Sequence, residues 1–206
     1  MVNRKNLALE KLFKTPYRGN EKFSDSDRNL DFTVLDFWSW SNSNLLENTI
    51  RGVLAEFIVA RALNIETDSR VEWESTDLSF EEVKIEVKSS AYIQAWEQKK
   101  LSTIQFSIAP THFDNTHPDF KQAPKRHSDI YIFCLFKETD PHQINPLDLS
   151  QWEFFVLATQ TLNERVGAQK SIGLNSLKNL DPKIVQYDRL QSTVRSISSD
   201  LKNEQL

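Results

Sequence analysis

The sequence predicts an α/β fold in which helices flank a central β-sheet, and three patterns carry this prediction. Apolar residues keep helical spacing from Leu45 to Leu63, which indicates one long amphipathic helix. Two near-continuous apolar runs, Ile130–Phe136 and Trp152–Ala158, are typical of central strands covered on both faces. Ahead of these runs, apolar and polar residues alternate over Ile104–Ile108, as in a half-buried strand.

The beginning of the chain is expected to be an extension that packs onto the main body. Residues 1–43 include a polar stretch and then an aromatic segment, Phe32–Trp40. Ser41 or Ser43 is the expected N-cap of the long helix, because a serine hydroxyl can accept a hydrogen bond from a free backbone amide. The main domain then covers residues 44–200, and residues 201–206 form a frayed tail.

Short strands and one long loop are expected in the middle of the chain. Strand patterns occur at Arg70–Trp73, Asp77–Phe80 and Val83–Ser89, and the last two are joined at Glu81-Glu82. The segment from Pro110 to Ser128 is polar, contains three prolines and reads as a loop. Loops of this length in compact domains are usually functional or mobile.

Three further elements are expected near the end of the chain. Thr161–Glu164 has the spacing of a capping box and predicts the start of a short helix. Ser171–Leu174 reads as a small strand, and Tyr187–Leu201 reads as a terminal helix.

Composition favours a globular protein of a reducing compartment. Of 206 residues, 39% are apolar, which is enough for a sizeable core. The single cysteine, Cys134, lies in an apolar run and reads as a core thiol. There is no secretory signal and no apolar stretch of bilayer length, so we expect no membrane association and a cytoplasmic location. A net charge of −4 argues against binding polyanions through bulk charge, but nucleic acid remains possible as a substrate.

The strand pattern around Glu86 carries the chemistry. Side chains alternate along a strand, so Glu86 and Lys88 point to one face while Ile85 and Val87 point to the core. Asp77 lies nine residues before Glu86, on the preceding strand of an expected hairpin. Two carboxylates can hold a divalent metal ion, and an ammonium beside them suits the cleavage of phosphodiester bonds.

These residues resemble the PD-(D/E)xK nuclease superfamily, whose restriction-endonuclease-like fold has a central mixed β-sheet flanked by helices. The resemblance rests on Glu56 in the leading helix, Asp77, and Glu86-Val87-Lys88, although Thr76 stands where the name leads one to expect proline. It implies that Asp77 and Glu86 bind Mg²⁺, with Mn²⁺ as a substitute. It also implies that Lys88 is the catalytic lysine, that Glu56 is the helical acidic residue, and that Gln105 supports the site.

The implied function is that of a metal-dependent nuclease that hydrolyses DNA phosphodiester bonds, of restriction type or associated with a mobile element. If the chain binds DNA, the long loop with Lys121, Lys125 and Arg126 is a candidate to contact it. Analogy with enzymes that cut both strands suggests a homodimer.

Other interpretations of the same residues remain open. The Glu-x-Lys spacing recurs at Glu82–Lys84 and Glu97–Lys99, so the run could be one solvated strand face with cross-strand ion pairs. Glu56 could form a surface ion pair, and Gln105 could be an ordinary polar strand residue. The alternative function is a catalytically inactive nucleic-acid- or partner-binding module on the same fold; a structural phage or mobile-element protein without a site is a third.

Overall fold

The computed structural model describes residues 16–66, 76–112 and 123–203. The chain divides into two compact units, Met1–Ser43 and Asn44–Leu206, which are described separately. The strand expected at 70–73 and the candidate contact Lys121 lie outside the described residues. No helix in the described parts of the chain is long and apolar enough to cross a membrane.

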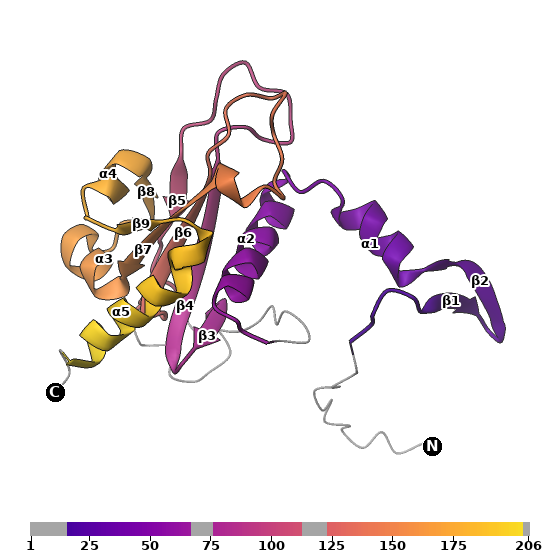
Figure 1. The fold of residues 1–206 in the computed structure, drawn as a ribbon, viewed down its shortest axis with the longest axis horizontal. Coiled ribbons are helices and arrows are strands. Elements are labelled where there is room, and N and C mark those ends of the chain that lie inside the picture. Colours follow the sequence, from indigo (N-terminus) through magenta and orange to yellow (C-terminus); the bar gives the residue numbers. More distant parts are fainter. Residues whose placement is uncertain (1–15, 67–75, 113–122, 204–206) are drawn as a thin grey trace, which may run out of the picture. The chain divides into compact units, whose positions relative to one another are not determined.

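The first unit contains a β-hairpin followed by a helix (Figure 1). Strands β1 (Lys22–Asp25) and β2 (Arg28–Thr33) are antiparallel, and α1 (Val34–Asn42) follows directly. Thr33 and Asp36 form a capping box at the start of α1, because each side chain bonds the other residue's backbone amide. No residue of α1 is buried. That this unit packs onto the main body therefore stays a prediction.

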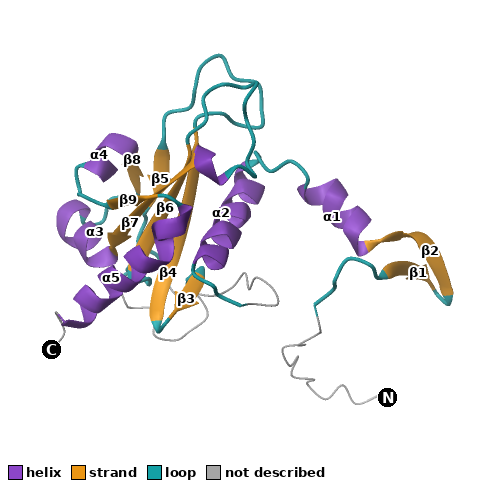
Figure 2. Ribbon diagram, viewed as in Figure 1, coloured by secondary structure: helices purple, strands orange, loops and turns teal. Residues whose placement is uncertain are grey.

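The second unit is built around a five-stranded mixed sheet with the strand order β3-β4-β6-β7-β9. Strands β4 and β6 are parallel, and every other neighbouring pair is antiparallel. The strands are β3 (Leu78–Phe80), β4 (Val83–Ala91), β6 (Ile130–Phe136), β7 (Trp152–Ala158) and β9 (Lys183–Val185). With helices packed against it, this sheet confirms the predicted α/β fold with a central mixed sheet (Figure 2).

Two hydrophobic cores lie on the two faces of this sheet. Helices α2 (Asn48–Ala62) and α5 (Leu190–Asn203) contribute to the first core, with Ala55, Val59, Leu190 and Val194 as buried examples. The second core is covered by a small two-stranded sheet and two helices. These elements are β5 (Gln105–Ser107), β8 (Ser171–Gly173), α3 (Thr159–Val166) and α4 (Leu174–Lys178). Short 3₁₀ turns complete the unit: η1 (Leu149–Gln151) and η2 (Tyr187–Arg189).

The apolar patterns predicted these strands well. Every residue of β6 is buried, as expected of a central strand covered on both faces. Around β5, Ile104, Phe106 and Ile108 are buried and the residues between them are exposed, which confirms the predicted alternation. Cys134 is fully buried, and burial raises the pKa of its thiol, so the prediction of a core residue is confirmed.

The predicted N-cap of the long helix is wrong. Helix α2 starts at Asn48 after Glu47, whose side chain makes no capping bond. Ser41 lies instead in α1, where its hydroxyl donates to the Phe37 carbonyl, and Ser43 is the C-cap of α1. A separate helix directly before α2 therefore uses both serines. The predicted capping box at Thr161 is also misplaced, because α3 begins two residues earlier at Thr159.

Candidate active site

The β3–β4 hairpin determines where the candidate residues lie. Leu78 pairs with Ile85 and Phe80 pairs with Val83, so Asp77, one residue before β3, lies beside Glu86 and Val87. The two strands are joined at Glu81 and Glu82, which have φ values of 49° and 71°. Two successive residues of positive φ allow a tight connection between antiparallel strands. The predicted hairpin is thus present, with Asp77 beside the Glu-x-Lys strand.

Strand β4 separates the candidate residues from the core as the alternation predicted. Ile85 and Val87 are 0% and 6% exposed and belong to the first core. Glu86 and Lys88 point to the opposite face, where they are partly exposed. In the parallel register with β6, Glu86 is opposite Tyr131, which belongs to the second core. Glu86 and Lys88 therefore lie at the margin of that core.

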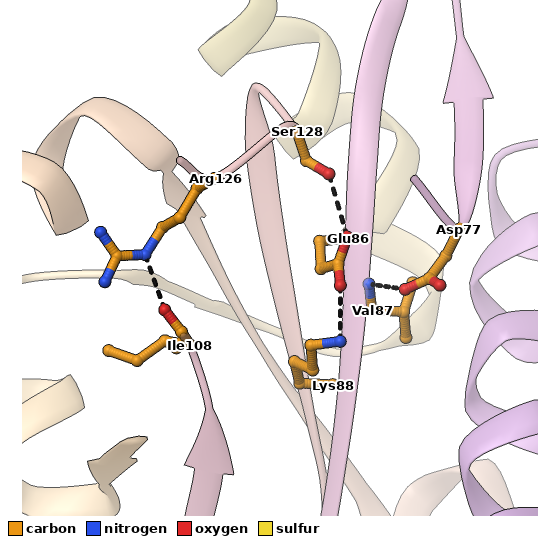
Figure 3. Close-up of polar contacts among 7 residues, drawn as sticks. All are labelled: Asp77, Glu86, Val87, Lys88, Ile108, Arg126 and Ser128. Atoms are coloured by element: carbon orange, nitrogen blue, oxygen red, sulfur yellow. Dashed lines mark hydrogen bonds and ion pairs between the residues drawn. The ribbon is translucent and has the colours of Figure 1, made fainter. Parts of the chain in front are cut away.

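Asp77 is fixed by the backbone of β4 (Figure 3). Its Oδ2 accepts a hydrogen bond of 2.8 Å from the amide of Val87. Burial raises the pKa of Asp77 from 3.8 to about 6, and the negative charge of Glu86 acts in the same direction. The amide of Val87 and the ammonium of Lys88 oppose this rise. The carboxyl is therefore held in place, and its charged form is short of favourable partners.

The carboxylate of Glu86 is bonded through both oxygens. Lys88 Nζ lies 2.5 Å from Oε1, and the hydroxyl of Ser128 donates to Oε2 at 3.1 Å. In Figure 3, Glu86 lies beside Lys88 and Ser128, while Asp77 reaches the β4 backbone from the β3 side. Burial and then the charge of Glu86 raise the pKa of the Tyr131 hydroxyl. Lys88, Ser128 and Tyr131 thus form the surroundings of Glu86.

Glu56 lies on α2, half-buried, and its charge adds to the rise in the pKa of Asp77. That effect is the weakest of those that act on Asp77. In residues 16–66, 76–112 and 123–203, no group of three or more His, Cys, Asp or Glu side chains is arranged to hold one metal ion. Glu56 is therefore close enough to act through its charge, without joining Asp77 and Glu86 in a three-carboxylate set.

Gln105 and Lys125 lie outside the Asp77–Glu86–Lys88 group. Gln105 is on β5, exposed, and its Nε2 donates to the hydroxyl of Ser171 on β8 at 2.9 Å. Lys125 is exposed, and its backbone pairs with Thr111 across the loop. Neither side chain is hydrogen-bonded to Asp77, Glu86 or Lys88.

Arg126, a predicted contact with nucleic acid, is bonded within the chain. The residue is 8% exposed, and each nitrogen of its guanidinium donates within the chain. The acceptors are the Ile108 carbonyl, Asn163 Oδ1 and the Gln169 carbonyl. Burial lowers the pKa of Arg126. This side chain ties the loop before β6 to β5 and α3 through three of its five N–H donors, and its contact with nucleic acid stays a prediction.

Ser128 is the residue of this site that the sequence did not indicate. It is 4% exposed, lies two residues before β6, and its contact with Glu86 joins positions 42 apart in the chain. Serine before a strand is common, so no local pattern marks this position. Only the parallel pairing of β4 with β6 brings the two residues together.

Comparison with known proteins places the chain in a family. The family model for bacteriophage T4 endonuclease IV matches residues 8–176, which include Glu56, Asp77, Glu86, Lys88 and Ser128. No curated protein and no solved structure matches the chain. The matched range covers most of the 206 residues and all of the candidate site. The chain therefore belongs to the bacteriophage T4 endonuclease IV family, a family of nucleases.

Proposed function

We propose that this chain is a metal-dependent endonuclease that hydrolyses DNA phosphodiester bonds at the Asp77–Glu86–Lys88 group. The observation that carries the proposal is the β3–β4 hairpin, which brings Asp77 to the backbone of Val87 between Glu86 and Lys88. Membership of an endonuclease family supports cleavage within a nucleic acid chain. The arrangement also supports the finer resemblance to the PD-(D/E)xK nucleases. The phage name of the family favours a mobile-element setting over restriction.

The donor set of Asp77 and Glu86 fits a magnesium ion. Magnesium prefers oxygen ligands and usually keeps several waters, so one or two protein carboxylates suffice. Burial, and then the negative charge of Glu86, raises the pKa of Asp77, and a cation at this position would favour the charged form of this carboxyl. A bound magnesium ion would polarise a phosphoryl oxygen and lower the pKa of a coordinated water. Mn²⁺, with similar ligand preferences, is expected to substitute.

The protein's own residues would then perform three tasks. The Val87 amide holds Asp77 in one orientation, and Ser128 does the same for Glu86. Lys88, whose ammonium lies on the same strand face, would orient the attacking water and stabilise negative charge that develops on the phosphate. The charge of Glu56 would favour a cation at Asp77. A homodimer would present two such sites to the two strands of a duplex, and light scattering of the full chain tests that part of the proposal.

The test is plasmid nicking by the full chain in the presence of Mg²⁺, with Asp77→Ala and Lys88→Ala as variants. Each substitution should reduce the cleavage rate by at least about a hundredfold, because each removes a group that acts on the reacting phosphate. Lys84→Ala is the matched control, because Lys84 is an exposed lysine of the same strand with the same spacing from a glutamate. Persistent cutting by both site variants would refute the assignment. Binding without cutting by the wild-type chain would favour the inactive module.

A further inference from the structure

We infer that the loop between β4 and β5 is a binding surface for an unpaired nucleobase and adjoining phosphates of the substrate strand, with Trp96, Lys99 and Lys100 as the contacting residues. This inference rests on the proposed function, because it assigns a contact to the substrate of that site. The loop follows Ala91, the last residue of the strand that carries Glu86 and Lys88. In Figure 1 it lies beyond the end of β4, at the end of the sheet where α2 begins.

The loop is braced from within by hydrogen bonds. Its ends are joined by the Ser102 amide, which donates to the Tyr92 carbonyl at 2.8 Å. The side chain of Gln98 accepts from the Gln94 amide at 2.6 Å and donates to the Ser102 hydroxyl at 2.9 Å. Compact loops whose ends meet and whose own side chains fill them are frequently functional. Because these hydrogen bonds lie within the loop, they hold its conformation without a ligand.

A bond to the main helix fixes this loop further. Arg51 of α2 donates to Gln94 Oε1 at 3.1 Å, and Gln94 Nε2 donates to the Ala91 carbonyl at 2.7 Å. Arg51 is itself 4% exposed. The base of the loop is thus attached both to α2 and to the end of β4.

The residues that face outward from this braced loop suit a single strand. Trp96 is 55% exposed, and Lys99 and Lys100 are exposed beside it. In the described part of the second unit, Trp96 is the one exposed tryptophan. Two lysines against the single Glu97 give the loop a net positive charge, in a chain whose net charge is −4. Aromatic rings that stack on bases, next to cations that neutralise phosphates, are the usual elements of single-strand binding.

The position of the loop relative to the candidate site fits one bound strand. Tyr92, one residue beyond β4, continues the alternation that places Glu86 and Lys88 on one face of the strand. Tyr92 packs against the second core, to which β5 also contributes. The loop therefore leaves and returns on the face of the sheet that carries Glu86 and Lys88. From Lys88 to Ala91 the strand advances roughly 10 Å. At about 3.4 Å per stacked nucleotide, a strand cut at the site would reach the loop within about three nucleotides.

The experiment measures the affinity of the full chain for a fluorescein-labelled single-stranded DNA oligonucleotide, without divalent metal, by anisotropy across a salt series. Trp96→Ala should weaken binding by roughly 5- to 150-fold, whereas Trp96→Phe should keep most of the affinity. The double variant Lys99→Ala, Lys100→Ala should lower the slope of log K against log salt by about 1.4. Trp40→Ala, which removes a tryptophan that is 83% exposed on α1, should bind like the wild type.

Cleavage kinetics on the same oligonucleotide separate this inference from the proposed function. Trp96→Ala should raise KM while leaving kcat nearly unchanged. Lys88→Ala should lose cleavage but still bind the oligonucleotide, and adding Trp96→Ala to it should weaken that binding. Wild-type affinity in Trp96→Ala, or an equal loss in Trp40→Ala, would overturn the loop assignment even if Lys88→Ala is inactive. Cleavage that survives in Lys88→Ala while binding depends on Trp96 would instead overturn the proposed function alone.

Discussion

At the scale of single residues, the surroundings of Glu86 distinguish it from the other Glu-x-Lys positions. Glu82 and Lys84 repeat the spacing on the same hairpin, but both are exposed. Oε2 of Glu82 lies 3.8 Å from Nζ of Lys202 on α5. Glu86 is half-buried and bonded through both oxygens, with Asp77 beside it. An exposed ion pair contributes little to stability, whereas two partly buried carboxylates close together raise each other's pKa. The two Glu-x-Lys sequences of this hairpin therefore lie in different environments.

Replacement of Asp77 by asparagine is expected to stabilise the metal-free protein at neutral pH. The pKa of Asp77 rises from 3.8 to about 6 on folding. Between about pH 4 and about pH 6 the folded state holds this proton while the unfolded state has lost it, so stability falls as the pH rises through that window. The free energy of unfolding of Asp77→Asn should exceed that of the wild type by about 1–3 kcal/mol at pH 7.

Urea denaturation with a chelator present, at about pH 4 and about pH 7, measures this difference. The gain should be small at the lower pH, where Asp77 is protonated in the folded state and still about half protonated in the unfolded state, and large at the higher one. Addition of Mg²⁺ at pH 7 should then raise the Tm of the wild type more than that of Asp77→Asn. A difference that does not change with pH would show that the raised pKa is not the cause.

Loss of the Ser128 hydroxyl is expected to weaken the site without removing any group that touches the substrate. Ser128→Ala leaves Glu86 Oε2 without its donor, so the carboxylate is less firmly oriented. Metal affinity measured by calorimetry, and cleavage rate, should each fall by roughly tenfold, and Ser128→Thr should restore most of the loss. Ser198→Ala is the control, since it alters an equally buried serine of α5. Equal effects of Ser198→Ala and Ser128→Ala would contradict a positioning role.

At the scale of elements, the β3–β4 hairpin carries the site, and its turn is strained. Glu81 and Glu82 both have positive φ, a region that side chains other than glycine enter at a cost of about 1 kcal/mol each. Glu82→Gly should therefore raise the free energy of unfolding by about 0.5–1 kcal/mol, because glycine adopts this φ without the cost. The ion pair with Lys202 that the substitution removes is exposed, so its loss offsets little of the gain. Chemical denaturation measures the change. Glu97→Gly, at a position without positive φ, should give no gain, and a gain of equal size there would contradict the explanation.

The elements show which parts of the fold a sequence pattern can predict. Burial on both faces leaves a continuous apolar run, so β6 and β7 were predicted with their observed bounds. Helix α2 was predicted from its periodicity, but its N-cap was wrong because Ser41 and Ser43 belong to the end of α1. A capping residue is one position with many equivalents in polar sequence, whereas periodicity sums over many positions.

At the scale of the whole molecule, the parts of the site that sequence could not predict are those created by pairing between distant segments. The hairpin that holds Asp77 and Glu86 is local, and the spacing of its residues predicted it. The contact from Ser128 to Glu86 depends on β6 lying parallel to β4, after a long connection. The internal bonds of Arg126 depend on Ile108 and on Asn163 of α3, which are 18 and 37 positions away in the chain. The sequence marks Arg126 only as a basic residue in a polar loop. Whether it faces solvent or the interior is decided by the tertiary structure.

The most direct test of the central claim is to locate a bound Mn²⁺ ion by anomalous diffraction from crystals of the full chain. We expect one peak that contacts carboxylate oxygens of both Asp77 and Glu86 at about 2.1 Å, and no such peak in crystals of Asp77→Ala. A chain that cleaves DNA with Mn²⁺ while the ion lies away from these two residues would contradict the proposed metal site.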